Sequence, residues 1–340
     1  MKKYICFAAM CSVLFVACID EPKQYENTKE GNFRALWEII DTRYCYLDYK
    51  GINWDSVYND YNERLQYVQD NKYELFDLFA EMLTELKDGH VNLYSSFDIS
   101  RYDKWYTDSA TNYYSSIVYS DDYVGKKVRI AGGLRYGRFL NYNIGYVYYG
   151  SFSDGFSETN IREVFEYFKD CDGLILDVRN NGGGALTYSE QLASYFFTEN
   201  KVTGYIRHKS GNGHSDFSKP VKLETIAADD SYRWTKPVVV LTNRYSYSAT
   251  NDFVSRMKQA PNAYVVGGWT GGGGGMPLSS ELPNGWMVRF SACPMYDVDM
   301  NDTEWGIAPD YWVMITNDDK ENNRDAIIDK AIQVISATND

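Results

Sequence analysis

Residues 173–184 read GLILDVRNNGGG, so that a continuous apolar run opens into three consecutive glycines. A second continuous apolar run, VVVL at 238–241, leads into a polar loop. Runs that do not alternate between apolar and polar side chains are typical of strands buried on both faces. The glycines after the first run would let backbone N–H groups point into a site, as an oxyanion hole requires. Taken alone they also suit a tight turn or a phosphate nest, although no Gly-Lys-Ser/Thr of a Walker loop follows.

Apolar side chains recur at helical spacing early in the chain, over residues 33–44, 54–65 and 75–86. Because each apolar stripe needs a partner surface, these segments predict a small three-helix unit. The third helix is expected to stop at Gly89, which suits a C-terminal cap. Residues 95–140 show no clear periodicity and are expected to form irregular segments and short strands. Further strands are predicted at 91–94, 144–149, 264–266 and 286–290, the last after a turn at 283–285, and further helices at 158–169, 248–259 and 323–336.

The first twenty residues have the layout of a secretory signal. Lys2 and Lys3 precede an apolar run over 4–17, which is shorter than the roughly 20 residues that a bilayer-spanning helix needs. Ala17 directly before Cys18 resembles a bacterial lipobox, in which Cys18 becomes the lipidated first residue of the mature chain. An ordinary cleaved signal with an incidental cysteine is the alternative. The sequence thus predicts an exported protein, lipid-anchored in the bacterial cell envelope on the periplasmic side or at the cell surface.

The composition argues against several classes of protein. With 44% hydrophobic residues and 8 prolines among 340, the chain does not have the composition of a disordered protein. Its formal net charge of −13 argues against binding to nucleic acid, which depends on clustered Lys and Arg. Besides Cys18, the mature chain would keep Cys45, Cys171 and Cys293, an odd number that cannot form a complete disulfide framework. Only three histidines are present, so a mechanism that needs one has few candidates.

Three candidate side chains stand at predicted element boundaries. Ser248 lies where the second buried strand is expected to pass into a helix, within TNRYSYSATNDF at 242–253. There it would gain from the helix dipole, and the amide of Ala249 could face a developing oxyanion. The alternative is that Ser248 is only an N-cap. His90 ends Asp-Gly-His at a helix-to-strand junction, and Glu304 begins EWGIAPD; each is compatible with a structural role when taken alone.

Together these segments resemble the tail-specific, or C-terminal processing, serine peptidases. The shared order is Asp-Gly-His, then Asp-x-Arg-Asn-Asn-x-Gly-Gly, then Ser-Ala, then Glu-x-Gly-Ile-x-Pro-Asp. The resemblance covers residues 30–335 and implies an α/β fold, with a ββα spiral core of the Clp-protease/crotonase type and an N-terminal three-helix subdomain. The organisation it implies is a lipoprotein signal peptide at 1–17, a tether at 18–30, a helical subdomain at 31–92, an irregular connecting segment at 93–140 and a catalytic core at 141–340.

One branch of this family uses a Ser-Lys dyad, and another, similar to the tricorn protease core, uses His and Glu. The stretch where the dyad lysine would lie, 267–275, contains no lysine. The resemblance therefore implies that Ser248 is the nucleophile, that His90 is its general base, and that Glu304 orients the imidazole or stabilises its charged form. A base is needed because serine is a poor nucleophile at its own pKa. The implied oxyanion-hole amides are those of Gly183 and Ala249, with Gly182 and Gly184 as alternatives for the glycine, and no metal or cofactor is implied.

Three features depart from the family pattern. Gly89 stands where tricorn has a serine that supports the histidine, and Asn251 stands where many relatives have glutamate. Many relatives also carry a PDZ domain, but no Gly-Leu-Gly-type carboxylate loop is found ahead of the core, so a chain without PDZ is expected. His208 and His214 lie in a polar segment typical of a surface hairpin, and both are expected to be non-catalytic.

The sequence thus predicts a serine endopeptidase that acts on polypeptides and attaches to a membrane through the lipid on Cys18. The alternative is a non-catalytic surface lipoprotein on the same fold, binding a peptide, glycan or lipid, which the 31 tyrosines and 8 tryptophans keep open. The joint presence of Ser248, His90, Glu304 and the glycine segment favours the peptidase.

Overall fold

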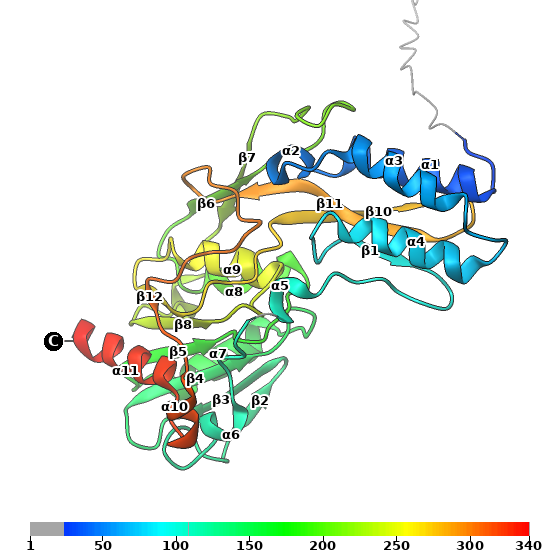
Figure 1. The fold of residues 1–340 in the computed structure, drawn as a ribbon. Helices are drawn as coiled ribbons and strands as arrows, with labels where there is room; N and C mark the ends of the chain where they lie inside the picture. The colour runs from blue at the N-terminus through cyan, green and yellow to red at the C-terminus, as the bar shows by residue number, and fades with distance from the viewer. Residues whose placement is uncertain (1–23, 108, 340) are drawn as a thin grey trace, which may run out of the picture.

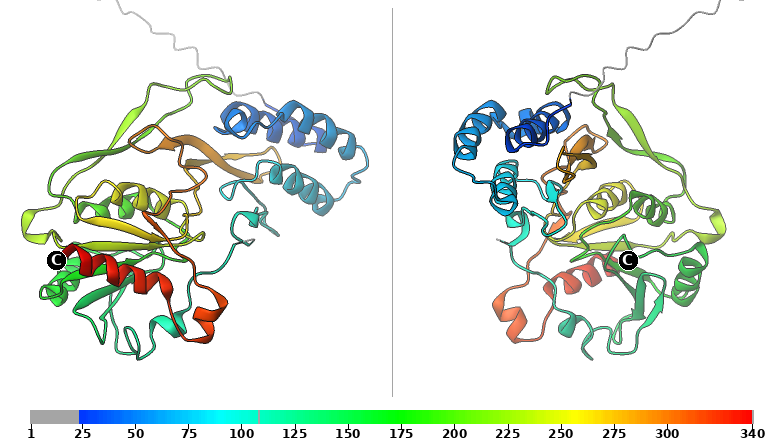
Figure 2. Two further views of the ribbon diagram at one scale, coloured as in Figure 1. Left: turned by 60° about the vertical axis from the view of Figure 1, so that its left-hand side comes forward. Right: turned by 90° about the vertical axis from the view of Figure 1, so that its right-hand side faces the viewer.

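The computed structural model describes residues 24–107 and 109–339 (Figure 1). The predicted signal peptide, the predicted lipidation site Cys18 and the first part of the predicted tether lie outside these residues. Within the described ranges, no helix is both long and apolar enough to cross a bilayer. A layer of N-terminal helices lies on a small sheet, and a larger sheet with helices on its faces lies beside it (Figure 2).

The N-terminal unit contains α1 (Lys29–Arg43), α2 (Leu47–Lys50), α3 (Trp54–Leu65) and α4 (Lys72–Thr84). The side chains of Thr28, Asn53 and Asn71 accept backbone N–H bonds at the starts of α1, α3 and α4, as N-cap residues do. The three longer helices confirm the predicted helical segments, and the structure adds the single-turn α2 between them.

α4 ends at Thr84, so the predicted cap at Gly89 is wrong. The left-handed position after the helix is instead Lys87, with φ 47°. Gly89 is required for space, because a Cβ there would lie 2.6 Å from Nε1 of Trp105 and 2.9 Å from Oη of Tyr247. The glycine therefore lets two aromatic side chains pack against this segment, where a serine would displace them.

The smaller sheet has the strand order β1-β11-β6-β7, and β10 pairs with β11 off this path. Its strands are β1 (Asn92–Tyr94), β6 (Lys201–Ile206), β7 (Val221–Thr225), β10 (Gly275–Glu281) and β11 (Met287–Tyr296). β10 and β11 form an antiparallel hairpin with Gly285 at φ 84° between them, which confirms the predicted turn. The N-terminal helices cover this sheet, since Phe33 and Phe79 share a buried cluster with Val288 and Phe290.

The larger sheet has the order β12-β9-β8-β5-β4-β3-β2. Its strands are β2 (Arg129–Ala131), β3 (Leu134–Arg138), β4 (Ile144–Tyr149), β5 (Gly173–Asp177), β8 (Val238–Thr242), β9 (Ala263–Gly267) and β12 (Tyr311–Trp312). Within this sheet β12, β9, β8, β5 and β4 pair in parallel with their neighbours in that order. β3 pairs antiparallel with β4 on one side and with β2 on the other. The fold is therefore of the predicted α/β class, and the two continuous apolar runs are its central strands.

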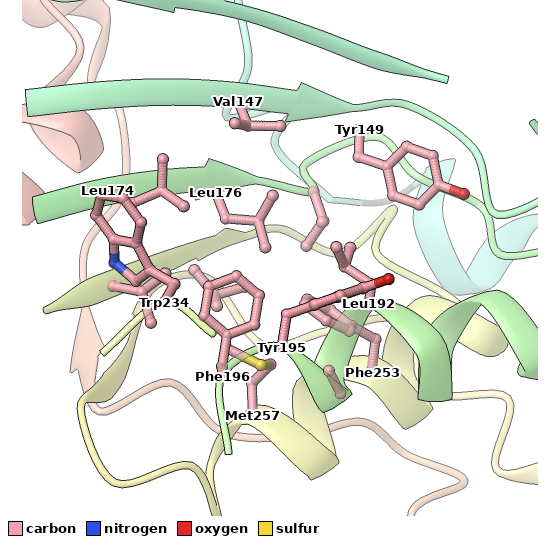
Figure 3. Close-up of a cluster of buried hydrophobic side chains, with 14 of the residues drawn as sticks. Val147, Tyr149, Leu174, Leu176, Leu192, Tyr195, Phe196, Trp234, Phe253 and Met257 are labelled. Atoms are coloured by element: carbon pink, nitrogen blue, oxygen red, sulfur yellow. The ribbon is translucent and has the colours of Figure 1, made fainter. Parts of the chain in front are cut away.

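Helices cover both faces of the larger sheet. Successive side chains of a strand point to opposite faces, so neighbouring residues of one strand pack against different helices. On one face Leu174 and Leu176 pack with Leu192 of α8 and Phe253 of α9 (Figure 3). On the other face Ile175 packs against α11. This double burial explains why the strands read as uninterrupted apolar runs.

The helices around the larger sheet and the short elements are α5 (Lys104–Thr107), α6 (Ser115–Val118), α7 (Glu158–Phe168), α8 (Leu186–Ser194), the 3-10 turn Asp230–Tyr232, α9 (Ala249–Met257), α10 (Asn317–Glu321) and α11 (Ala326–Asn339).

β5 and β8 are parallel neighbours, so their carboxyl ends lie at one edge of the sheet. The glycine segment 178–184 follows β5 at this edge, and the loop 243–248 follows β8. β1, which follows His90, belongs to the smaller sheet. The candidate residues therefore come from both parts of the fold.

Candidate active site

Ser248 stands at the N-cap position of α9, but its side chain makes no capping hydrogen bond. Its Oγ lies 2.8 Å from Nε2 of His90. The Ser248 backbone has φ 59° and ψ −120°, a conformation that non-glycine residues rarely adopt and that clusters at functional sites. A serine that serves only as an N-cap would direct its hydroxyl to the helix backbone. The structure therefore separates Ser248 from that alternative.

His90 reaches Ser248 from the segment between α4 and β1. It is buried, and its backbone N–H donates to Oδ1 of Asp88 at 2.8 Å. Burial lowers the pKa of His90 to about 4; Asp88 opposes this shift, and the positive charge of Arg289 adds to it. The ring is consequently neutral near pH 7, and Nε2 can accept the Ser248 proton when Nδ1 carries the ring hydrogen. Nδ1 makes no hydrogen bond of normal geometry within the described residues.

Glu304 forms no hydrogen bond to His90 within the described residues, so the structure does not show it orienting the imidazole directly, as the resemblance implied. Its carboxylate instead forms an ion pair of 2.7 Å with Nζ of Lys50 and accepts the backbone N–H of Gly274 at 3.1 Å. The physical reason is burial: Glu304 is only 4% exposed, and a buried carboxylate is stabilised far more by a cation than by a neutral imidazole.

Lys50 connects Glu304 to the histidine segment. It was not among the residues that the sequence predicted for the site. Its Nζ also lies 3.6 Å from Oδ2 of Asp88, the residue that holds the His90 backbone. Asp88 further accepts bonds from the hydroxyls of Tyr44 and Ser291. We call Tyr44, Lys50, Asp88, Ser291 and Glu304 the Lys50 cluster. No local pattern in the sequence marks Lys50, which ends a single-turn helix far from every motif.

The charges of the Lys50 cluster are strongly coupled. Burial raises the pKa of Glu304 to about 8, and the nearby Asp88 carboxylate adds to the rise, while Lys50 opposes it. Burial alone would lower the pKa of Lys50, but Asp88 and Glu304 outweigh it and raise that pKa. Lys50 therefore stays a cation, and Glu304 is the member of the cluster whose carboxyl exchanges a proton near pH 8.

The glycine segment lies directly against the nucleophile. Gly183 has φ 98°, and a Cβ there would lie 2.6 Å from the Tyr247 carbonyl oxygen and 2.8 Å from Cβ of Ser248. Only glycine fits this position. The Gly183 N–H, however, already donates to Oδ1 of Asn181 at 3.0 Å. The Ala249 N–H has no acceptor among the described residues, so it is free to bind an oxyanion.

Asn251 braces the loop that carries Glu304. Its Nδ2 donates to the Thr303 carbonyl at 3.0 Å, and its Oδ1 accepts the hydroxyl of Thr270 at 2.5 Å. The same Thr270 hydroxyl oxygen accepts the backbone N–H of Ile307. A glutamate could not donate to the Thr303 carbonyl while ionised, so this chain uses the amide to fix the loop through neutral hydrogen bonds.

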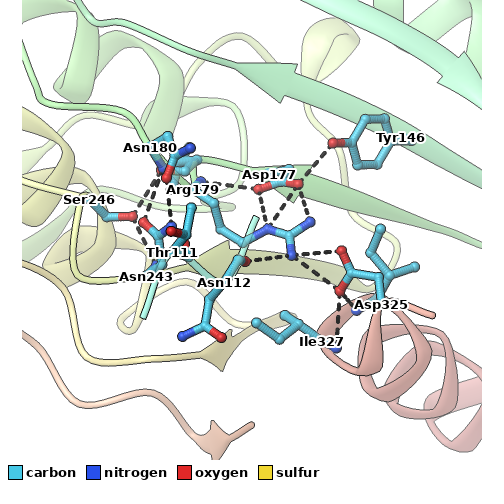
Figure 4. A network of polar contacts seen from close by, with 12 residues as sticks. Thr111, Asn112, Tyr146, Asp177, Arg179, Asn180, Asn243, Ser246, Asp325 and Ile327 are labelled. Atoms are coloured by element: carbon cyan, nitrogen blue, oxygen red, sulfur yellow. Dashed lines mark hydrogen bonds and ion pairs between the residues drawn. The ribbon is translucent and has the colours of Figure 1, made fainter. Parts of the chain in front are cut away.

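A buried polar network fixes the two loops that follow β5 and β8 (Figure 4). The guanidinium of Arg179 binds the carboxylates of Asp177 and Asp325, with closest distances of 2.6 and 2.8 Å. Asn243 donates to Oδ1 of Asn180 and accepts the Asn180 backbone N–H, at 2.7 and 3.0 Å. The network thereby ties the glycine segment to the serine loop and to the start of α11.

A cavity of about 280 Å³ opens beside Ser248 and His90. Gly184 and Leu186 line one part of it, and Met276 and Arg289 of the β10–β11 hairpin line another. Its lining is mixed in polarity, with buried hydroxyl and amide groups between apolar side chains. Such a cavity can hold a side chain of an extended polypeptide next to the serine.

The other two histidines lie on the hairpin between β6 and β7, and neither lines this cavity. His214 contacts Asp41 at 2.8 Å and Asp48 at 3.3 Å, and Nδ1 of His208 lies 3.4 Å from Sγ of Cys293. In the part of the chain that the structure describes, no group of His, Cys, Asp and Glu is arranged to hold a metal ion.

Comparison with known proteins places this site in context. Residues 143–313 match peptidase family S41, and residues 25–84 match the tricorn protease C1 domain. The crystal structure of a candidate peptidase from Parabacteroides merdae ATCC 43184 is 52% identical, with a TM-score of 0.84, over 91% of this chain and 97% of that one. Mature CPAF in complex with lactacystin shares the fold, with a TM-score of 0.67 and 12% identity over 91% of this chain and 99% of that one.

Among curated relatives, the carboxy-terminal processing protease CtpA of Bacillus subtilis is 26% identical over 183 residues, which are 51% of this chain. The matched region is only 36% of that relative, so the chain spans about a third of its length.

Proposed function

Since the chain belongs to peptidase family S41, we propose that it is a serine endopeptidase with Ser248 as nucleophile and His90 as general base. The observation that carries this proposal is the 2.8 Å contact between the Ser248 hydroxyl and Nε2 of a buried, neutral His90, at the edge of a cavity. Geometry of this kind lets the imidazole take the hydroxyl proton as the serine attacks a carbonyl carbon. The curated relative CtpA, a carboxy-terminal processing protease, supports the same class of reaction.

The reaction would proceed in two halves. In the first, His90 accepts the Ser248 proton, an acyl-enzyme forms, and the imidazolium returns the proton to the leaving amine. In the second, His90 activates water in the same way and the acyl group is released. The Ala249 N–H would stabilise the oxyanion in both halves. The glycine donor would be Gly183, whose N–H must then share its bond with Asn181, or Gly184, which lines the cavity.

Glu304 would act on His90 indirectly, through the Lys50 cluster. Glu304 holds Lys50, Lys50 lies beside Asp88, and Asp88 fixes the backbone of His90. When His90 becomes charged during the reaction, the Asp88 carboxylate would stabilise it, because this carboxylate raises the pKa of the ring. In this proposal Glu304 and Lys50 are positioning residues, and the catalytic residues are Ser248 and His90.

The pH profile of kcat/KM is expected to have its acid limb near pH 4 and not near 6.5. The free imidazole must be neutral to accept a proton, and burial lowers the pKa of His90 to about 4, so activity is lost only as pH falls through that value. The measurement is kcat/KM for one peptide between pH 3.5 and 8, with folding checked at each pH. Glu304→Gln is the matched control, since it removes the carboxyl with a pKa of about 8 and should leave the acid limb in place. A limb at pH 6 to 7 in both proteins would contradict the assignment.

The decisive experiment for the function itself is incubation of purified protein with an unfolded polypeptide, followed by mass spectrometry of the new termini. Cleavage by the wild type that is absent from the Ser248→Ala variant supports the proposal. If both proteins bind the polypeptide and neither cleaves it, the binding lipoprotein is favoured instead.

We also propose that the protein is exported and held at a membrane by a lipid on Cys18. The charged start, the apolar run over 4–17 and the Ala17-Cys18 pair support this proposal. Cells producing the wild type should incorporate a palmitate analogue into the protein, and the Cys18→Ser variant should not. Cys11→Ser, which changes a cysteine within the predicted signal, is the matched control and should still be labelled. Labelling of Cys18→Ser at the wild-type level would overturn the anchor.

A further inference from the structure

Arg289 is a cation of the cavity that has no anionic partner among the described residues. It lies in β11, lines the cavity together with Ser248 and His90, and is partly buried. Its hydrogen bond within the described chain is a long one, 3.4 Å from Nη1 to Oδ1 of Asn92, its cross-strand neighbour. A guanidinium carries five N–H donors, so most of its capacity is unused.

The other buried cations near the sheet ends are all compensated. Lys50 is paired with Glu304, Arg179 with Asp177 and Asp325, and Arg256 with Asp252. Even Arg244, which pairs with no carboxylate in the part of the chain that the structure describes, donates to the carbonyls of Trp105, Thr270 and Trp305. Withdrawing a charge from water is costly unless a partner replaces the water. Arg289 is therefore the cation of this cavity that pairs with no carboxylate of the described residues, and its free donors can take up a partner from outside them.

The position of Arg289 indicates which part of a substrate it would meet. His90 delivers its proton to the leaving amine, so the peptide on the C-terminal side of the scissile bond passes the imidazole. Arg289 lines the same cavity as His90, and its cross-strand neighbour Asn92 is two residues after His90, so the guanidinium lies beside that passage. An arginine is suited to a carboxylate in particular, because two parallel N–H donors match its two oxygens.

Resting on the proposed peptidase function, we infer that Arg289 is a specificity-determining residue that binds a carboxylate on the leaving side of the scissile bond. That carboxylate is either the free chain end or an Asp or Glu side chain. With a net charge of −13, the protein as a whole repels acidic chains, so selection of a carboxylate must come from a local cation of this kind. The site would then favour cleavage shortly before a chain end or before an acidic residue.

The test separates binding from cleavage by using the Ser248→Ala background. Three forms of one peptide are prepared, with Gln at the first position after the scissile bond in the first two. The first form ends shortly after that bond in a free carboxyl group, and the second ends there in an amide. The third also ends in an amide but carries Glu in place of that Gln. Dissociation constants are measured by calorimetry for Ser248→Ala alone and combined with Arg289→Gln, Arg289→Lys or Arg324→Gln. Arg324 lies on the surface far along the chain and is the control for loss of a positive charge.

A charge-assisted hydrogen bond predicts a preference of about tenfold to a hundredfold for one of the two carboxylate peptides over its neutral counterpart. Arg289→Gln should reduce this ratio to near one, Arg289→Lys should leave part of it, and Arg324→Gln should leave it whole. Preference for the free terminus identifies the chain end as the source, and preference for Glu identifies the side chain. A ratio below two for both carboxylates, or a ratio that survives in Arg289→Gln, overturns the inference.

These outcomes are independent of the proposed function. If the wild type cleaves none of the peptides, the peptidase assignment fails, while the binding ratios still decide the role of Arg289. If all peptides are cleaved equally and bound equally, the peptidase assignment stands and the carboxylate site is excluded.

Discussion

Replacing Ser248 with alanine is expected to lower kcat for peptide cleavage by roughly a million-fold, the scale on which loss of a serine nucleophile acts in hydrolases that share this chemistry. The reason is that the hydroxyl is the attacking group, and among the described residues His90 Nε2 hydrogen-bonds to no other side chain. The substitution removes one oxygen atom. Alanine has the same Cβ as serine, so the backbone strain at position 248 does not change and the folded state should persist. The measurement is single-turnover cleavage of a fluorogenic peptide.

His90→Ala and the double variant make this expectation specific. Because a nucleophile and its base act as one unit, the double variant should be no slower than Ser248→Ala by more than a few-fold. Ser336→Ala is a matched control, since this hydroxyl bonds the Ile332 carbonyl within α11, away from the cavity. Cleavage by Ser248→Ala within tenfold of the wild type would refute the assignment of the nucleophile.

Replacing Arg179 with alanine is expected to lower the free energy of unfolding by about 3 to 5 kcal/mol, the usual consequence of removing one partner of a buried ion pair. Arg179 is fully buried, and its loss leaves the carboxylates of Asp177 and Asp325 without their cation. Asp325 also accepts the backbone N–H groups of Ile327 and Ile328, so the start of α11 should loosen as well. Against a total stability of about 5 to 15 kcal/mol, this is a large effect.

Urea unfolding followed by circular dichroism measures the change, and Arg324→Ala is the matched control. Arg324 also pairs with two aspartates, Asp319 and Asp329, but its side chain is 54% exposed. Exposed pairs contribute about 0 to 1 kcal/mol, because water competes for both charges. Equal losses for the two variants would show that burial of the Arg179 network is not what makes it stabilising.

Much of the fold could be read from the chain because its signals are local. The uninterrupted runs at 173–178 and 238–241 predicted central strands, since burial on both faces leaves no polar positions. Helical periodicity predicted α1, α3 and α4 in the same way. The end of α4 was mispredicted because glycine signals a cap only when nothing else requires it, and Gly89 is required by the packing of Trp105 and Tyr247.

The candidate site divides along the same line. Motif order brought Ser248, His90 and the glycine segment forward, and the structure places all of them together. The partner of Glu304 could not be found this way, because Lys50 lies 254 positions away and its ammonium reaches the carboxylate only after the helical unit docks on the small sheet. The role of Asn251 was hidden for the same reason, as its hydrogen bonds run to Thr270 and Thr303 in two other loops.

The sequence by itself therefore determined the strands, the main helices, the α/β class and the residue types of the reaction, because periodicity, strand burial and short motifs depend on neighbours in the chain. Only the tertiary structure decided which charges meet. It paired Glu304 with Lys50 and not with His90, and it left Arg289 in the cavity without an anion from the described residues. Ion pairing in a buried site depends on distances of a few ångströms between segments far apart in the chain, and no local pattern encodes those distances.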